Sequence, residues 1–134
     1  MIETIVILVK KALFHMDQAH DLIFRARRNE ARTMEEQGLQ GAEFLWRHEC
    51  AAANYATMGY SDMNTAKAIY YAKYEPGTDD ILESLFAKCE NFVKEILDDQ
   101  ATSHSPQWVD IYMQEILELV EGTEYDVPSL HSES

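Results

Sequence analysis

The chain has few cysteines and no long apolar run. Its 134 residues include two cysteines, Cys50 and Cys89, whereas a small secreted domain held together by disulfides normally has more. The apolar run Ile5–Val9 ends at Lys10, but a membrane span needs about 20 apolar residues and a secretory signal also needs a longer stretch. We therefore expect a cytoplasmic protein without a membrane span, in which both cysteines are reduced, buried thiols.

Basic residues are scarce, above all in the second half of the chain. Eleven Lys and Arg stand against 24 Asp and Glu, which gives a formal net charge of −13 at pH 7. Residues 1–74 contain nine of each sign and are neutral, whereas residues 75–134 contain two lysines and fifteen acids, so 2 − 15 accounts for the whole −13. A charge of this sign opposes direct binding to nucleic acid or to an anionic membrane surface.

Motifs that would identify a reaction are missing as well. The sequence has no glycine-rich phosphate loop, no Cys-x-x-Cys pair and no nucleophile elbow. Asp17 and His20 have a spacing that lets two ligands reach one metal ion, but a di-metal centre in a helical bundle needs a second such pair, which the chain lacks. We therefore expect no enzyme activity, no catalytic residue, no metal and no cofactor. A helical metal-binding protein ranks third among the functions considered.

Alternation typical of β-strands is also absent, and a helical period takes its place. Glycines and prolines mark the expected helix ends. We expect helices over residues 2–36, 42–58, 61–74, 79–98 and 105–122, with Gly59 ending the second, although residues 31–58 could form one helix or two. The predicted fold is a single all-α domain, an irregular bundle of four to five helices over residues 1–122. Residues 123–134 are polar and are expected to form a flexible tail.

Apolar residues fill one face of each of the last two expected helices. These faces run from Ile81 to Leu97 and from Trp108 to Val120, and we expect them to pack together in the core. Acidic residues recur on the other faces at spacings of three, four or multiples of these, and carboxylates one turn apart lie about 5 to 6 Å from each other, similar to phosphates along a strand. The expected partner-binding face consists of Asp79, Asp80, Glu83, Glu90, Asp98, Asp110, Glu118 and Glu121. A solvated face without a partner would have the same pattern.

Small size, helical pattern, regional acidity and missing catalytic motifs occur together in this chain. The combination is similar to that of small phage or mobile-element inhibitors that imitate DNA and occlude restriction or CRISPR machinery. The resemblance is one of composition and covers no motif. It implies a nucleic-acid-mimic inhibitor of the anti-defence type, whose partner is a basic nucleic-acid-binding protein and which binds no nucleic acid itself.

An alternative function is a helical protein-protein interaction or assembly module. Five tyrosines fall within residues 55–74, and Tyr70, Tyr71 and Tyr74 crowd into a short stretch of one helix. Tyrosine is enriched at binding hot spots but is also common at the boundary of a helical core. The apolar run Ile5–Val9 covers every side of the first helix, so a homodimer that buries part of this helix also remains open.

Overall fold

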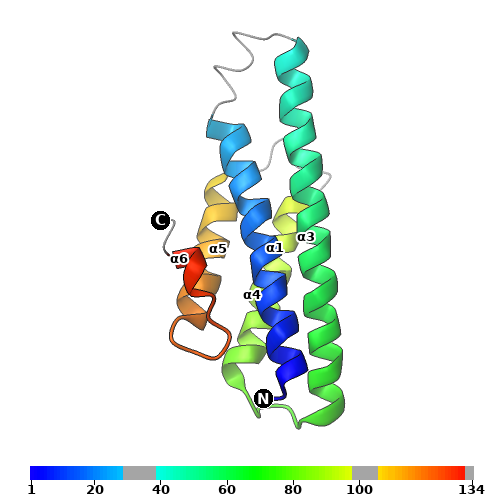
Figure 1. Cartoon of the computed structure of the whole chain (residues 1–134), viewed down its shortest axis with the longest axis vertical. Helices are drawn as coiled ribbons and strands as arrows, with labels where there is room; N and C mark the ends of the chain where they lie inside the picture. Colours follow the sequence, from blue (N-terminus) through cyan, green and yellow to red (C-terminus); the bar gives the residue numbers. More distant parts are fainter. Residues whose placement is uncertain (29–38, 98–105, 132–134) are drawn as a thin grey trace.

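The computed structural model is all-α and confirms the expected fold class (Figure 1). It describes residues 1–28, 39–97 and 106–131. Within these ranges it contains no strand and five helices: α1 (Glu3–Arg28), α3 (Leu39–Lys73), α4 (Asp80–Leu97), α5 (Pro106–Val120) and α6 (Pro128–His131). No helix in the same ranges is both long and apolar enough to cross a membrane.

The four long helices form a ring that runs alternately up and down. The packed pairs are α1 with α3, α3 with α4, α4 with α5, and α5 with α1, and the most extensive of them is α1 with α3. In the view of Figure 1, α1 and α3 lie in front of α4 and α5, and the start of α1 lies at the same end of the bundle as the turn from α3 to α4. This is the arrangement of an up-and-down four-helix bundle.

The core confirms the predicted packing of residues 81–97 against residues 108–120. The buried apolar residues of these two helices are Leu82, Leu85, Phe86, Cys89, Phe92, Val93 and Ile96 on α4, and Val109, Met113, Ile116, Leu117 and Val120 on α5. The predicted faces were too long at their ends, because Ile81, Leu97 and Trp108 are exposed. A residue in the first or last turn of a helix has packing neighbours on fewer sides than a residue in the middle.

A single helix replaces the two that were expected to meet at Gly59. α3 continues through this glycine, which is buried against α1. A Cβ atom at position 59 would lie 3.1 Å from the Ala12 carbonyl oxygen and 3.1 Å from Met16 Cγ, closer than such atoms ordinarily approach. Gly59 therefore allows the two helices to approach closely and does not end α3. Residues 39–58 lie in one helix, and the predicted helical residues 29–36 lie outside the described part of the chain.

Two other glycines end segments as the sequence predicts. Gly77 has a φ of 87° and lies in the turn between α3 and α4, and Gly122 has a φ of 76° and follows α5. Both values fall in the left-handed region, which a residue with a Cβ atom adopts only at a cost in conformational energy. The glycines therefore permit the sharp changes of direction at these two points.

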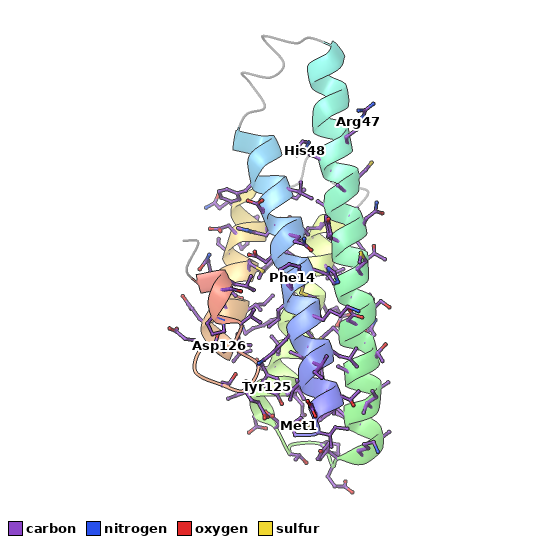
Figure 2. All side chains as sticks on the ribbon, viewed as in Figure 1. Met1, Phe14, Arg47, His48, Tyr125 and Asp126 are labelled. Carbon is purple, nitrogen blue, oxygen red and sulfur yellow. The ribbon has the colours of Figure 1, made fainter. Side chains whose placement is uncertain are left out.

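The segment after α5 differs from the loose tail that we expected. Tyr125 and Leu130 are buried, and the residues from Pro128 form the short helix α6. Tyr125 lies at the end of the bundle where α1 begins (Figure 2). The burial of these two side chains holds the segment against the bundle. Two isolated apolar residues produce no helical period, so no sequence pattern indicates this packing. Residues 132–134 lie outside the described part.

Candidate functional site

Two tyrosines and two carboxylates form a hydrogen-bonded cluster where α3 ends and α4 begins. The Tyr70 hydroxyl donates to Glu83 Oε2 at 2.6 Å, and the Tyr125 hydroxyl donates to Asp79 Oδ2 at 2.7 Å. The Asp79 backbone N–H donates to the Tyr70 hydroxyl oxygen at 3.0 Å. We call these four residues the tyrosine cluster. It connects α3, α4 and the segment after α5 through their side chains.

The same two carboxylates also define the first turn of α4. Asp79 Oδ1 accepts the Leu82 backbone N–H at 2.9 Å, which makes Asp79 the N-terminal cap of the helix. Glu83 Oε2 accepts the Gly77 backbone N–H at 2.7 Å. A carboxylate is also favoured at this position by the positive end of the helix dipole. The conformation of the turn and the start of α4 therefore depends on Asp79 and Glu83.

Burial raises the pKa of both tyrosines in the cluster above the ordinary value of 10.0. The nearby carboxylates act in the same direction, because a negative charge beside a phenol disfavours its ionisation: Glu83 does so for Tyr70, and Asp79 for Tyr125. Both hydroxyls are consequently protonated donors at neutral pH. The hydrogen bonds of the cluster hold together the end of α3, the start of α4 and the segment after α5. The tyrosines add no charge to it.

Two more of the acidic residues predicted to bind a partner have interactions within the molecule. Lys94 Nζ lies 3.1 Å from Glu90 Oε1, one turn away on α4. His20 Nε2 on α1 lies 2.9 Å from Asp110 Oδ1 on α5. With the two carboxylates of the tyrosine cluster, four of the eight predicted residues therefore have internal partners. A fifth, Asp98, lies outside the described residues.

The remaining three predicted residues are exposed at one end of the bundle. They are Asp80, at the start of α4, and Glu118 and Glu121, near the end of α5. Glu75, in the preceding turn, is also exposed, and no hydrogen-bond or ion-pair partner for any of the four carboxylates occurs among the residues that the structure describes. Figure 1 shows that α5 runs toward the end of the bundle at which α4 begins. We call these four residues the acidic end.

The three clustered tyrosines do not form one surface. Tyr70 is buried, which corrects the expectation that it belongs to an interaction surface, and its ring packs beside Tyr74 and Phe86. Tyr74 is half-buried, and its hydroxyl accepts the Ile2 backbone N–H at 3.2 Å. Tyr71 alone is exposed, because a step of one residue turns a side chain by about 100° around the helix.

The histidines of α1 contact acidic residues on two other helices. His20 pairs with Asp110 of α5, and His15 Nε2 lies 3.9 Å from Asp62 Oδ2 on α3. The spacing of Asp17 and His20 had suggested a pair of metal ligands. Among residues 1–28, 39–97 and 106–131, no three His, Cys, Asp or Glu side chains lie close enough together to hold a metal ion.

The two cysteines differ in exposure. Cys89 is buried, as expected, and burial raises the pKa of its thiol, which keeps the sulfur protonated and unreactive. Cys50 is exposed on α3, which corrects the expectation that both thiols are buried. Both are free cysteines.

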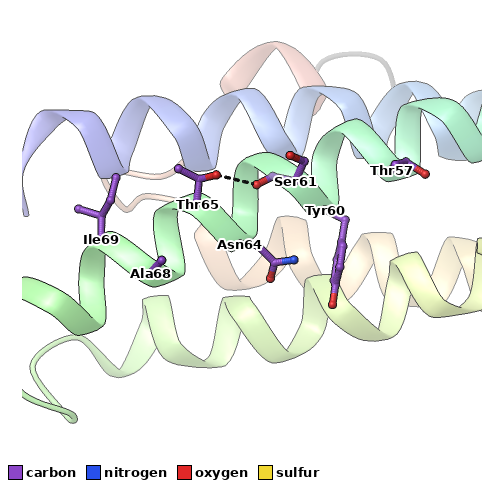
Figure 3. A pocket seen from close by; sticks show the side chains of 7 residues that line it. All are labelled: Thr57, Tyr60, Ser61, Asn64, Thr65, Ala68 and Ile69. Carbon is purple, nitrogen blue, oxygen red and sulfur yellow. Dashed lines mark hydrogen bonds between the residues drawn. The ribbon is translucent and has the colours of Figure 1, made fainter.

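A shallow depression runs along the outer face of α3 (Figure 3). Its lining consists of Thr57, Tyr60, Ser61, Asn64, Thr65, Ala68 and Ile69. The Thr57 hydroxyl donates to the Ala53 carbonyl at 2.8 Å, and the Thr65 hydroxyl donates to the Ser61 carbonyl at 3.0 Å. No carboxylate, amine, imidazole or thiol is among these lining residues.

Comparison with known proteins gives no relative. No family model, no curated protein and no solved structure matches the chain.

Proposed function

We propose that the protein is a non-enzymatic acidic binding protein that occupies the basic nucleic-acid-binding surface of a partner protein. It would act as a nucleic-acid-mimic inhibitor. Its composition is similar to that of inhibitors of the anti-defence type, so we include an anti-defence role in the proposal. The observation that carries this proposal is the acidic end, where four exposed carboxylates have no partner within the described parts of the molecule. Like charges held together repel one another, and a basic partner would remove that repulsion.

The geometry supports a rigid acidic surface. Glu118 lies in the last turn of α5, and Glu121 directly follows the helix, where its backbone N–H still donates to the Leu117 carbonyl at 3.1 Å. Side chains three residues apart in this conformation are about 5 to 6 Å apart, which is similar to the spacing of neighbouring phosphates. The tyrosine cluster holds the first turn of α4 and therefore the backbone of Asp80. A charged surface that is already in place loses little conformational entropy when a partner binds.

The structure also narrows the set of contact residues that we propose. Asp79 and Glu83 support the turn, Glu90 pairs with a lysine, and Asp110 pairs with a histidine. These carboxylates already have partners within the same molecule, so they contribute to the overall negative potential but are not the proposed contacts. The proposed contacts are the residues of the acidic end.

Affinity capture from the native host tests this proposal. The protein is immobilised, exposed to host lysate, and washed at low and at high salt before the eluted proteins are identified. We expect a basic nucleic-acid-binding protein that is lost at high salt, because screening shortens to about 8 Å at physiological ionic strength and further above it. The captured protein should be released by added DNA or RNA. A partner that resists salt and nucleic acid would contradict the proposal, as would the recovery of no partner.

A further inference from the structure

The face shared by α1 and α3 exposes three large apolar side chains. Ile7 is 56 % exposed, Phe14 is 48 % exposed and Met58 is 47 % exposed. Ile7 and Phe14 are seven residues apart on α1, so they lie on one line about two turns long. Phe14 is labelled on α1, in the front layer of the bundle, in Figure 2. This apolar line belongs to α1, whereas the residues of the acidic end belong to the start of α4, the turn before it and the end of α5.

Two lysines accompany these apolar residues. Lys10 and Lys11 are exposed between Ile7 and Phe14, and in the described part of the chain neither has an ion-pair partner, although acids outnumber bases about two to one in the sequence. Lys11 also reaches a groove between α1 and α3 with a volume of about 260 Å³. The groove is lined by Lys11, His15, Thr57, Met58, Ser61 and Asp62.

We propose that this face binds an amphipathic helix of another protein, one whose apolar stripe is flanked by Asp and Glu. Ile7, Phe14 and Met58 would contact the apolar stripe, since helix recognition of this kind uses apolar anchors spaced by one and two turns. Lys10 and Lys11 would pair with the flanking carboxylates and set the orientation of the helix. We name Ile7, Lys10, Lys11, Phe14 and Met58 the α1 docking face.

Charge disfavours two other occupants of the α1 docking face. A second copy packed through the same face about a two-fold axis would bring the two lysine pairs together, since such an interface uses one patch on both subunits. An anionic membrane presents charge to a whole side of the molecule and would be repelled by a protein with a net charge of −13. A single acidic helix would contact only the α1 docking face, and at physiological ionic strength charges more than about 8 Å away are largely screened. An acidic helix satisfies both the apolar residues and the lysines. The protein would then have two separate binding surfaces, one for a basic partner and one for an acidic helix.

Two labelled peptides test the α1 docking face by fluorescence anisotropy. Both are amphipathic helices of about 18 residues, or five turns, with the same leucine stripe, flanked by Glu in the first and by Lys in the second. We expect the Glu peptide to bind the full-length protein, and both Ile7→Ser/Phe14→Ser and Lys10→Glu/Lys11→Glu to weaken that binding at least about tenfold. The matched control, Lys67→Glu/Lys73→Glu, makes the same charge change elsewhere and should leave affinity within about twofold.

Other results would overturn the inference. These are the absence of binding by the Glu peptide, equal weakening in the control variant, or a concentration-dependent dimer in sedimentation equilibrium that Phe14→Ser abolishes. The last result would assign the face to a second copy. The Lys peptide carries the charge that the acidic end is proposed to bind, and the Glu peptide the charge that the α1 docking face is proposed to bind. Loss of binding by one peptide therefore overturns the proposal for one surface without affecting the other. Circular dichroism melts confirm that each variant is folded.

Discussion

Tyr125 connects the segment after α5 to the rest of the bundle through one hydroxyl. This phenol is buried and donates to the carboxylate of Asp79, which also caps α4. We predict that Tyr125→Phe lowers the free energy of unfolding by about 1.5 to 3 kcal/mol, the range for a hydrogen bond to a charged group. Urea denaturation measures this loss. Tyr71→Phe is the control, because Tyr71 is exposed, and it should change stability by less than about 0.5 kcal/mol.

Stability should fall in alkali because of the same cluster. The pKa values of Tyr70 and Tyr125 are raised in the folded protein, so the unfolded chain loses these protons first as the pH rises. The free energy of unfolding is then unaffected below the ordinary tyrosine pKa of 10.0 and declines as the pH rises above it towards the folded-state values. Urea melts between pH 8 and pH 11.5, on the order of the tyrosine range, should show this decline. If the variant Tyr70→Phe/Tyr125→Phe declines as steeply as the wild type, the tyrosines are not its cause.

Sequence patterns predicted part of this residue-level detail. The start of α4 was predicted to within one residue, because the residues that begin a helix are neighbours in the sequence. The partners of Tyr70 and Tyr125 come from other elements, and a hydrogen bond between distant residues leaves no local pattern. The internal role of Glu83 was missed for this reason, and the sequence placed it on a partner-binding face instead.

At the level of elements, the packing of α3 on α1 depends on Gly59. A larger side chain here must displace the Ala12 carbonyl and the Met16 side chain. We predict that Gly59→Leu destabilises the protein by about 1 to 3 kcal/mol through overpacking. Ala68→Leu, at an exposed position on the same helix, should be nearly neutral in the same urea melts. Equal effects of the two variants would mean that the close approach of α1 and α3 is not important for stability.

The interface between α4 and α5 gives a second prediction at this level. Leu85 and Phe92 are fully buried on α4, so Leu85→Ala or Phe92→Ala should each cost about 2 to 5 kcal/mol in lost burial and cavity formation. Leu97→Ala is the control, because Leu97 is exposed and should cost much less. A loss below about 1 kcal/mol at either buried position would contradict the core described above.

Helix type was easier to predict than helix length. The apolar faces of α4 and α5 have an unbroken period, which only a half-buried helix explains. The length of α3 could not be predicted, because a glycine costs only about 1 kcal/mol inside a helix, and packing against α1 outweighs that cost. The expected break at Gly59 followed from local propensity, whereas the continuous helix follows from a contact between two helices.

For the whole molecule, the concentration of acidic residues in the second half could be counted from the sequence. Which of these carboxylates have a partner within the molecule, and which do not, could not be predicted. Periodicity places Glu83 and Asp110 on outer helix faces, and only the folded arrangement brings Tyr70 and His20 to them. Glu90 and Lys94 are one turn apart on the same helix, so the spacing that allows this pairing was already present in the sequence. The acidic end is therefore a smaller surface than the predicted face. Its position at one end of the bundle follows from the antiparallel pairing of α4 and α5.

In the proposed mode of binding, the location of the charge, rather than its total, determines the affinity for the basic partner. Two variants separate these effects, because each changes the net charge by +3, from −13 to −10. The first removes three charges from the acidic end, Asp80→Asn/Glu118→Gln/Glu121→Gln. The second adds three lysines at exposed positions on α3, Asn54→Lys/Asn64→Lys/Ala68→Lys.

The most direct measurement is the affinity of these two variants and of the wild type for the captured basic protein, titrated at one low salt concentration. We predict that neutralising the acidic end weakens binding at least about tenfold, a change of about 1.4 kcal/mol. The α3 variant should bind within about twofold of the wild type. Equal weakening in both variants would show that only the net charge matters, and unchanged binding after neutralisation of the acidic end would contradict the proposed surface.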